Sequence, residues 1–178
     1  MSNINSKKIA ITALMSAFSI ILATISNLRL PFLTFFKLDF SDIPIFILSF
    51  LLGVKHGITS LFVVSIIRML TGDSVLLSAF ALRMSTSVVV FFINIYNKYQ
   101  KNFAWFAAAA IICNIVIRAP ISYYMWINCY NVPKEIFINK MWSNIILLTT
   151  IRLLFNITIS KLIFNYLSKN SIVKNEQK

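Results

Sequence analysis

Long apolar runs, broken by short polar segments, make up most of the chain. A helix that crosses a bilayer needs roughly 20 apolar residues, so a chain of 178 residues has room for about six such helices. We therefore predict an all-α integral membrane protein, a bundle of six transmembrane helices covering residues 9–167 between two polar tails, 1–8 and 168–178. The predicted helices are 9–28, 43–54, 58–71, 75–96, 103–127 and 141–167.

The composition excludes an ordinary water-soluble domain, since 58% of the residues are hydrophobic and 12% are charged. Cys113 and Cys129 would lie roughly 24 Å apart along one helix, at a rise of 1.5 Å per residue. That separation is too large for a disulfide bond. The sequence shows no metal-ligand pattern, and we expect neither a metal nor a cofactor.

The lysines are distributed unevenly between the predicted connections. If the N-terminus is cytoplasmic, the inner segments hold most lysines, whereas the acids, apart from Glu176, lie in the outer ones. The inner lysines are Lys7, Lys8, Lys55, Lys98, Lys101, Lys161, Lys169, Lys174 and Lys178. Because cytoplasmic segments carry an excess of lysine and arginine, we expect both termini inside the cell, in the cell membrane. The net charge of +12 reflects this bias rather than a nucleic-acid surface.

Two carboxylates and a lysine interrupt the apolar runs within residues 36–44. Ser41 or Asp42 is expected to cap the following helix, with Pro44 in its first turn, where a missing N–H is harmless. We expect the loop 29–42 to act as a gate over the outer mouth of the bundle. The predicted gate residues are Lys37, Asp39, Phe40 and Asp42.

Four arginines lie within the predicted third to sixth helices, one on each, and all in the outer half of the membrane. They are Arg68, Arg83, Arg118 and Arg152. An arginine at the centre of a bilayer costs roughly 2.5–3.5 kcal/mol, and no acid is predicted inside the membrane to pair with these four. We hypothesise that Asp39, at the outer surface, pairs with one of them when the site is empty.

Polar residues recur every four positions on the predicted fifth and sixth helices and so share one face of each helix. We predict a binding pocket open to the outside, in which arginines offer paired donors to a phosphate or carboxylate. The predicted binding residues are Arg68, Arg83, Asn114, Arg118, Ser122, Trp126, Asn144 and Arg152. Alternatively, each arginine could extend to the outer interface or interact with the carbonyls at a helix end.

The sequence contains no motif that would allow the protein to drive transport by itself. It lacks the Gly-x-x-x-x-Gly-Lys-Ser/Thr loop of ATPases, an intramembrane carboxylate for an ion relay and a visible internal repeat of the kind that secondary transporters use. We therefore expect a protein that binds a solute, is not an enzyme, and depends on partner subunits.

Ala13 and Ala17 lie four residues apart near the predicted cytoplasmic end of the first helix, which would let another helix approach closely. They could also pack within the bundle itself. Together with the segment 38–44, the Gly53 turn and the helix end 65–70, they make the chain resemble the substrate-binding S components of energy-coupling factor (ECF) transporters, most nearly the riboflavin-specific type.

The resemblance implies a six-helix bundle that captures a vitamin or precursor from outside, with the loop after the first helix as its gate. It also implies that Ala13 and Ala17 dock on a membrane scaffold (T) subunit, which works with two cytoplasmic ATPases. Arg68 occupies the place where the riboflavin type usually has a basic residue.

The later part of the chain departs from the riboflavin pattern. Residues 78–83 read Ser-Ala-Phe-Ala-Leu-Arg where that pattern has Gly-Glu-x-Ala-Asn, and the Pro-Phe-Asn opening of the sixth helix is missing. Because riboflavin is neutral, the arginines favour a phosphorylated flavin or a carboxylate vitamin. An alternative function, suggested by a looser likeness of residues 65–70, is that of a membrane subunit in polyprenyl diphosphate metabolism. Enzymes acting on diphosphates usually carry Asp-rich motifs for Mg²⁺, which this sequence lacks.

Overall fold

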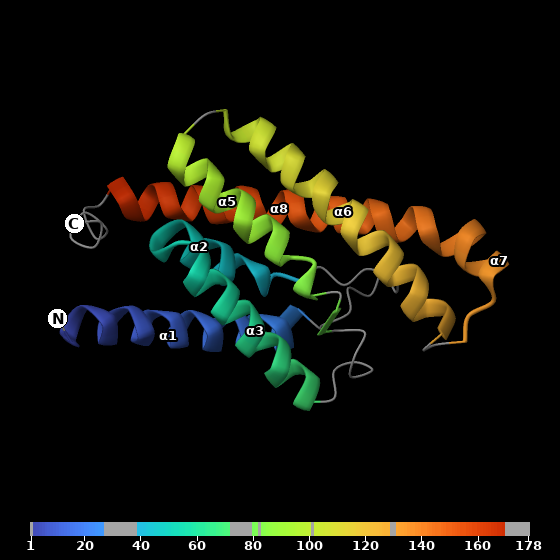
Figure 1. Ribbon diagram of the computed structural model, residues 1–178, viewed down its shortest axis with the longest axis horizontal. Coiled ribbons are helices and arrows are strands. Elements are labelled where there is room, and N and C mark those ends of the chain that lie inside the picture. Colours follow the sequence, from blue (N-terminus) through green and yellow to red (C-terminus); the bar gives the residue numbers. More distant parts are fainter. Residues whose placement is uncertain are drawn as a thin grey trace.

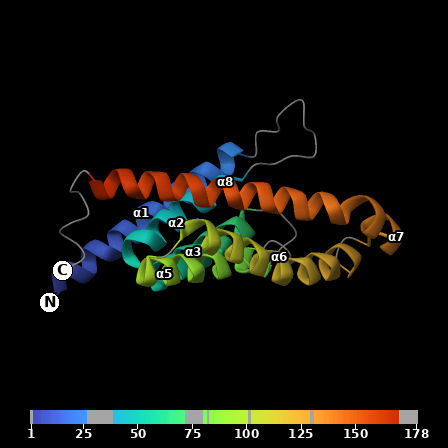
Figure 2. The ribbon, with the colours of Figure 1, turned by 90° about the horizontal axis from the view of Figure 1, so that it is seen from above.

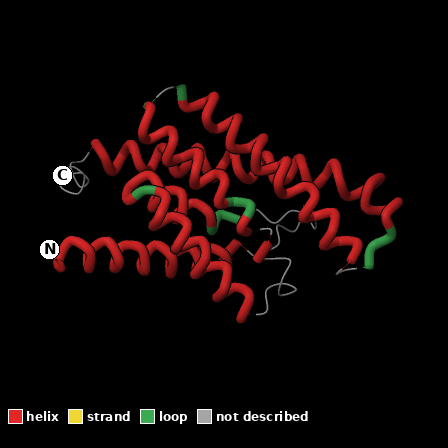
Figure 3. Tube along the Cα trace, viewed as in Figure 1, coloured by secondary structure: helices red, strands yellow, loops and turns green. Residues whose placement is uncertain are grey.

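A computed structural model describes residues 2–26, 39–71, 80–81, 83–100, 102–128 and 131–169. Across these ranges the chain forms helices joined by short loops and contains no strand (Figure 3), so the prediction of an all-α fold is confirmed for the described part. The helices are α1 (Ser2–Ser26), α2 (Asp42–Leu52), α3 (Val54–Leu70), α5 (Ser87–Tyr99), α6 (Phe103–Asn128), α7 (Lys134–Ile136) and α8 (Trp142–Lys169), with a π-helical segment, Phe137–Met141, directly before α8.

Helix α2 lies at the centre of the bundle and packs against α1, α3, α5 and α8. All its residues from Asp42 to Phe50 are buried, and Ile45, Phe46 and Leu48 are completely so. A helix that is apolar all round is expected in such a position. Helix α8 runs along almost the whole length of the molecule beside it (Figures 1 and 2).

Helix α1 turns its polar side inward and its apolar side outward. The hydroxyl of Thr12 lies 3.0 Å from Nδ1 of His56, and the hydroxyls of Ser16 and Ser60 lie 2.7 Å apart, so two hydrogen bonds join α1 to α3. On the opposite side, the side chain of Leu14 is 69% exposed. Interhelical hydrogen bonds and small residues at helix contacts are typical of membrane bundles.

Three helices of the described part are long and apolar enough to cross a membrane. Their spans are Ser6–Ile25, Phe103–Asn128 and Trp142–Lys169, and Asp42–Leu52 is a shorter apolar helix. Helix α1 begins and α8 ends at the same end of the molecule (Figure 1). The six crossings and their orientation stay predictions.

The predicted turn at residues 53–57 is shorter in the structure. Gly53 alone separates α2 from α3, because its φ of 86° reverses the chain in one residue. Gly57 therefore lies inside α3 and packs closely on α2, where a Cβ atom would come within 2.1 Å of the Ser49 hydroxyl.

The other helix boundaries agree to different degrees with those predicted from the sequence. Helix α6 begins at the predicted residue, and α8 begins one residue later than predicted, at Trp142. Helix α1 begins at Ser2, earlier than expected, and the predicted end of this helix lies outside the described residues.

The prediction of one continuous helix at 75–96 is wrong within the part that the structure describes. A turn at Ser85 and Thr86 interrupts it before α5 begins, with hydrogen bonds from Thr86 N to Arg83 O and from Val89 N to Thr86 O. The Nδ2 amide of Asn114, on α6, donates a hydrogen bond to the Ser85 carbonyl at 2.8 Å. This bond stabilises the irregular turn.

Candidate functional site

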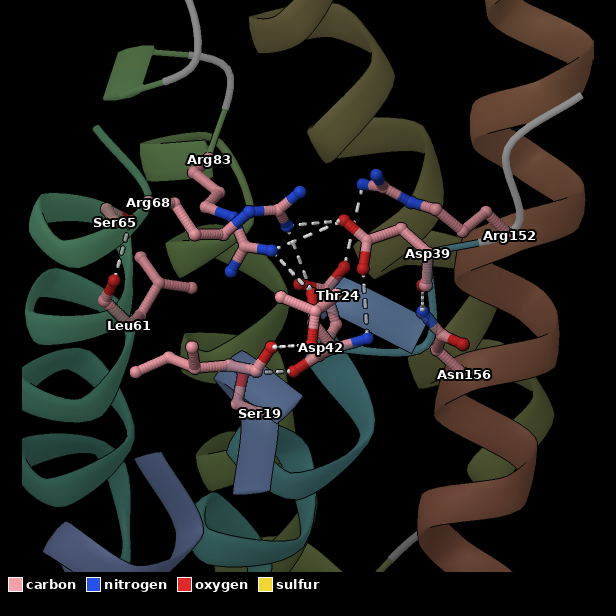
Figure 4. Close-up of polar contacts among 12 residues, drawn as sticks. Ser19, Thr24, Asp39, Asp42, Leu61, Ser65, Arg68, Arg83, Arg152 and Asn156 are labelled. Carbon is pink, nitrogen blue, oxygen red and sulfur yellow. Dashed lines mark hydrogen bonds and ion pairs between the residues drawn. The ribbon is translucent and has the colours of Figure 1, made fainter. Parts of the chain in front are cut away.

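The carboxylate of Asp39 faces two arginines from different helical segments, which lie together on one side of it (Figure 4). Nη1 of Arg68, on the last turn of α3, donates to Oδ2 at 2.8 Å, and Nη2 of Arg83 lies 3.2 Å from the same oxygen. All three side chains are at most 19% exposed. The expected pairing of Asp39 with an arginine is confirmed, and the carboxylate contacts two arginines rather than one.

Ser41 is the residue that joins this contact to the start of α2. Its backbone N–H donates to Oδ1 of Asp39 at 3.0 Å, and its hydroxyl accepts hydrogen bonds from Arg83 and, at 3.5 Å, from Arg68. Ser41 occupies the predicted N-cap position but makes no side-chain capping bond. The expected cap bond is absent because the hydroxyl is turned toward the arginines.

Asp42 forms a second ion pair at the first turn of α2. Its Oδ2 lies 3.6 Å from Nη2 of Arg152 on α8, and the Asp42 side chain is only 2% exposed. The expectation that no acid would pair with the arginines inside the bundle is therefore wrong. Asp39 and Asp42 lie inward rather than at the surface because the beginning of α2 is buried among the other helices.

We call Arg68, Arg83 and Arg152, with Asp39 and Asp42, the arginine cluster. Three guanidinium groups meet two carboxylates there, so the cluster carries one excess positive charge. Nη1 of Arg83 and Nε of Arg152 are buried and make no hydrogen bond to any described residue. Burial by itself would raise the pKa of Asp39, but Arg83, Arg68 and Arg152 together hold it below its usual value. The Asp39 carboxylate is therefore charged at neutral pH.

Arg118 lies beside the arginine cluster on α6 and adds to its positive charge. It interacts electrostatically with Arg152 and Asp42, and it lines a small cleft between α6 and α8 with Ser122 and Thr149. The spacing of four that predicted a shared face for Arg118 and Ser122 is confirmed by this common lining.

A family model for the substrate-specific component of ECF transporters matches residues 7–168. The chain belongs to this family. Membership makes the protein a substrate-capture component of an ECF-type importer, which works with a small-molecule substrate and with T and ATPase subunits, and the family is not one of enzymes. With its apolar helices, the match also indicates a membrane protein. No curated protein and no solved structure matches the chain.

The remaining predicted binding residues of this S component are Asn114 and Trp126 on α6 and Asn144 on α8. Asn114 is buried and donates to the Ser85 carbonyl, which gives it a structural contact. Trp126 is half-buried about two turns beyond Arg118 on α6, and Asn144 is exposed about two turns before Arg152 on α8.

The predicted gate and docking residues are only partly described. Lys37 and most of the loop 29–42 lie outside the described residues. Phe40 is half-buried, with its ring 5.9 Å from that of Phe155. Ala13 and Ala17 are both exposed on the outward side of α1.

Three polar residues of the site were not among the predicted binding residues. Asn156 Nδ2 donates to the Asp39 carbonyl at 2.9 Å, the Ser160 hydroxyl donates to the Ile43 carbonyl at 3.2 Å, and Ser19 donates to the Ser41 carbonyl. They fix the backbone that carries the two carboxylates. Asn156 and Ser160 follow Arg152 at intervals of four, so the sequence predicted for them an inward polar face shared with Arg152, and both are buried. For Ser19 there was no such signal in the sequence.

Proposed function

We propose that this S component captures an anionic vitamin or vitamin precursor, with a phosphorylated flavin or a carboxylate vitamin as the leading candidates. The single observation that carries the proposal is the convergence of Arg68, Arg83 and Arg152 on two carboxylates, with guanidinium N–H groups left over. Arginine offers planar, paired donors that match phosphate and carboxylate groups. Arg118 and Ser122 would extend the site along α6.

In the proposal, the ligand anion replaces Asp39 as the partner of Arg68 and Arg83. A mobile internal carboxylate would satisfy these arginines between binding events, since uncompensated buried charges are costly. Asp39 is suited to this because it belongs to the proposed gate loop 29–42 and contacts both arginines. Its release from the arginines would be linked to movement of that loop.

The proposed topology is six crossings of the cell membrane with both termini in the cytoplasm. It is supported by the common end at which α1 begins and α8 ends (Figure 1). Lys98 in the last turn of α5 and Lys169 at the end of α8 would then be cytoplasmic, as the positive-inside rule requires. The arginine cluster would lie toward the outer side.

The proposed docking surface for the T subunit is the exposed side of α1 around Ala13 and Ala17. This side is turned away from the hydrogen bonds that attach α1 to α3, so a partner helix could approach without displacing a neighbour. Two cytoplasmic ATPase subunits would supply the energy for release of the ligand inside the cell.

The experiment that tests this function is identification of whatever co-purifies with the protein, by mass spectrometry and flavin fluorescence, followed by calorimetric titration. We expect the protein to bind one small ligand with nanomolar affinity. We also expect flavin mononucleotide to bind more tightly than neutral riboflavin. A preference for the neutral form would contradict the anionic assignment. Metal-dependent product formation from a polyprenyl diphosphate would instead support the alternative function.

A further inference from the structure

A second polar pocket lies further along α8 than the arginine cluster, toward the end of that helix. It is a cavity of about 200 Å³ where the C-terminal parts of α2, α5 and α8 meet. Its lining residues are Phe50, Tyr96, Asn97, Gln100, Lys161 and Phe164. Lys161 follows Arg152 by nine positions on α8, which separates the two sites by about 13 Å along the helix at 1.5 Å per residue.

The ammonium group of Lys161 is held over aromatic rings. Nζ lies 4.5 Å from the ring centroid of Tyr96, 5.0 Å from that of Phe164 and 5.3 Å from that of Phe50. The rings also support one another, because Phe50 stacks on Phe164 at 5.2 Å and meets Tyr96 edge-on. Cation–π contacts of this kind position the ammonium without satisfying its three N–H donors.

No carboxylate within the described ranges comes within 4.0 Å of the Lys161 ammonium. The other polar side chains that line the cavity are the phenol of Tyr96 and two amides: Asn97 uses one N–H to donate to the Phe50 carbonyl, and Gln100 is exposed. The pocket therefore presents a fixed positive charge and amide donors, which together recognise an anion with several oxygens.

The surroundings of the pocket are typical of a membrane interface. Tyr99, Trp105 and Tyr166 are between 57% and 76% exposed near this end of the bundle. The ammonium of Lys98 lies 5.5 Å from the Tyr99 ring centroid. Aromatic side chains gather at the level of lipid headgroups, and basic pockets between helices at that level bind anionic headgroups.

We infer that the pocket around Lys161 binds a phosphate group, supplied by the headgroup of an anionic phospholipid. The inference is independent of substrate capture, since it uses none of the residues of the arginine cluster. The lipid would bridge the C-terminal parts of α2, α5 and α8 and stabilise the bundle at this end.

The test compares Lys161→Met, which keeps a long apolar side chain among the rings, with Lys169→Met, which removes an exposed lysine of the same helix. Purified protein is given phosphatidylglycerol, phosphatidylcholine or inorganic phosphate, and bound lipid and Tm are measured. We expect phosphatidylglycerol to be retained about fivefold less by Lys161→Met, the effect of one lysine near an anionic surface. Lys169→Met should retain it as the unmodified chain does.

Each possible outcome bears on the inference. A rise in Tm with inorganic phosphate alone that depends on Lys161 would support the phosphate site and assign a free anion as its source. Equal retention of phosphatidylglycerol by both variants, or an equal loss in both, would overturn the inference. If Lys161→Met does not fold, Gln100→Gly provides a second variant, because glycine keeps the left-handed backbone at φ 46° and removes the side chain that carries the amide. Unchanged phosphatidylglycerol binding in Gln100→Gly would then count against the pocket.

Discussion

The carboxylate of Asp39 accepts a 2.8 Å hydrogen bond from Arg68, which lies 29 positions further along the chain. This bond ties the segment before α2 to the last turn of α3. Arg83 contacts the same oxygen, so one carboxylate organises two guanidinium groups. Any anion that enters the arginine cluster must compete with Asp39, and the strength of that competition can be measured.

We predict that Asp39→Asn lowers the Tm of the empty protein and tightens binding of an anionic ligand. The substitution keeps the shape of the side chain but removes the charge that the ligand must displace. A hydrogen bond to a charged group contributes roughly 1.5–3 kcal/mol, so we expect affinity to rise about tenfold or more. Thermal melting with and without ligand, together with calorimetric titration, measures both effects.

A matched control for this prediction is Glu135→Gln, which removes an exposed carboxylate on α7. It should change neither Tm nor affinity by a comparable amount. If Asp39→Asn leaves affinity and the rate of ligand release unchanged, the proposed role of Asp39 in gating is wrong.

A second prediction separates the structural role of Arg152 from its proposed role in binding. Arg152→Met leaves the Asp42 carboxylate buried without its cation, which should lower the free energy of unfolding by about 3–5 kcal/mol. Adding Asp42→Asn removes the uncompensated charge, so the double variant should regain most of the lost stability. Thermal melting of the two single variants and the double variant gives this coupling.

Ligand binding should respond differently to the same variants. We expect anionic ligand affinity to be lost in Arg152→Met and to stay low in the double variant, because the guanidinium donors are missing from both. A double variant with restored stability and normal affinity would show that Arg152 holds α2 in place and does not contact the ligand.

Much of the helical layout could be predicted from the sequence, because long apolar runs and polar breaks are local features. The beginning of α6 at Phe103 follows from such a run. The interruption at Ser85 and Thr86 could not be predicted in this way, since it depends on the Asn114 amide, 29 positions away from Ser85. The single-residue turn at Gly53 depends on close packing of Gly57 against α2, which hydropathy does not reveal.

The arginines of the site could be predicted from the sequence, but the carboxylates that pair with them could not. Spacing along one helix brought Arg118 together with Ser122, and the cost of burying arginine singled out Arg152. Hydropathy placed Asp39 and Asp42 at the surface, since charged residues normally mark loops. Their burial follows from the position of α2 at the centre of the bundle, a tertiary feature that no local pattern reports.

A third prediction concerns the contact between α2 and α3. In Gly57→Ala, the new Cβ would lie 2.1 Å from the Ser49 hydroxyl and 2.8 Å from a methyl group of Val90. Overpacking of this kind typically costs about 1–3 kcal/mol, so we expect a clearly lower Tm. Thr59→Ala, at an exposed position two residues further on the same helix, should melt close to the unmodified protein. Similar melting temperatures for both variants would contradict the close approach of the two helices.

A fourth prediction tests the proposed docking surface on α1. In Ala13→Trp, an indole replaces a methyl group on the exposed side of the helix, which prevents another helix from approaching closely. The hydrogen bonds of Thr12 and Ser16 to α3 lie on the other side and are left intact. We therefore expect normal ligand binding by the purified variant and loss of ligand uptake by cells that contain the whole transporter.

The control for Ala13→Trp is Ala108→Trp on α6, because Ala104 and Ala108 form another pair of exposed alanines four residues apart. Both variants add the same bulk to an outward surface, so a general effect on insertion or folding would reduce uptake in both. Loss of uptake in Ala13→Trp alone would assign docking to α1. Loss in Ala108→Trp alone would move the docking surface to α6, and normal uptake in both would mean that neither pair of alanines meets the T subunit.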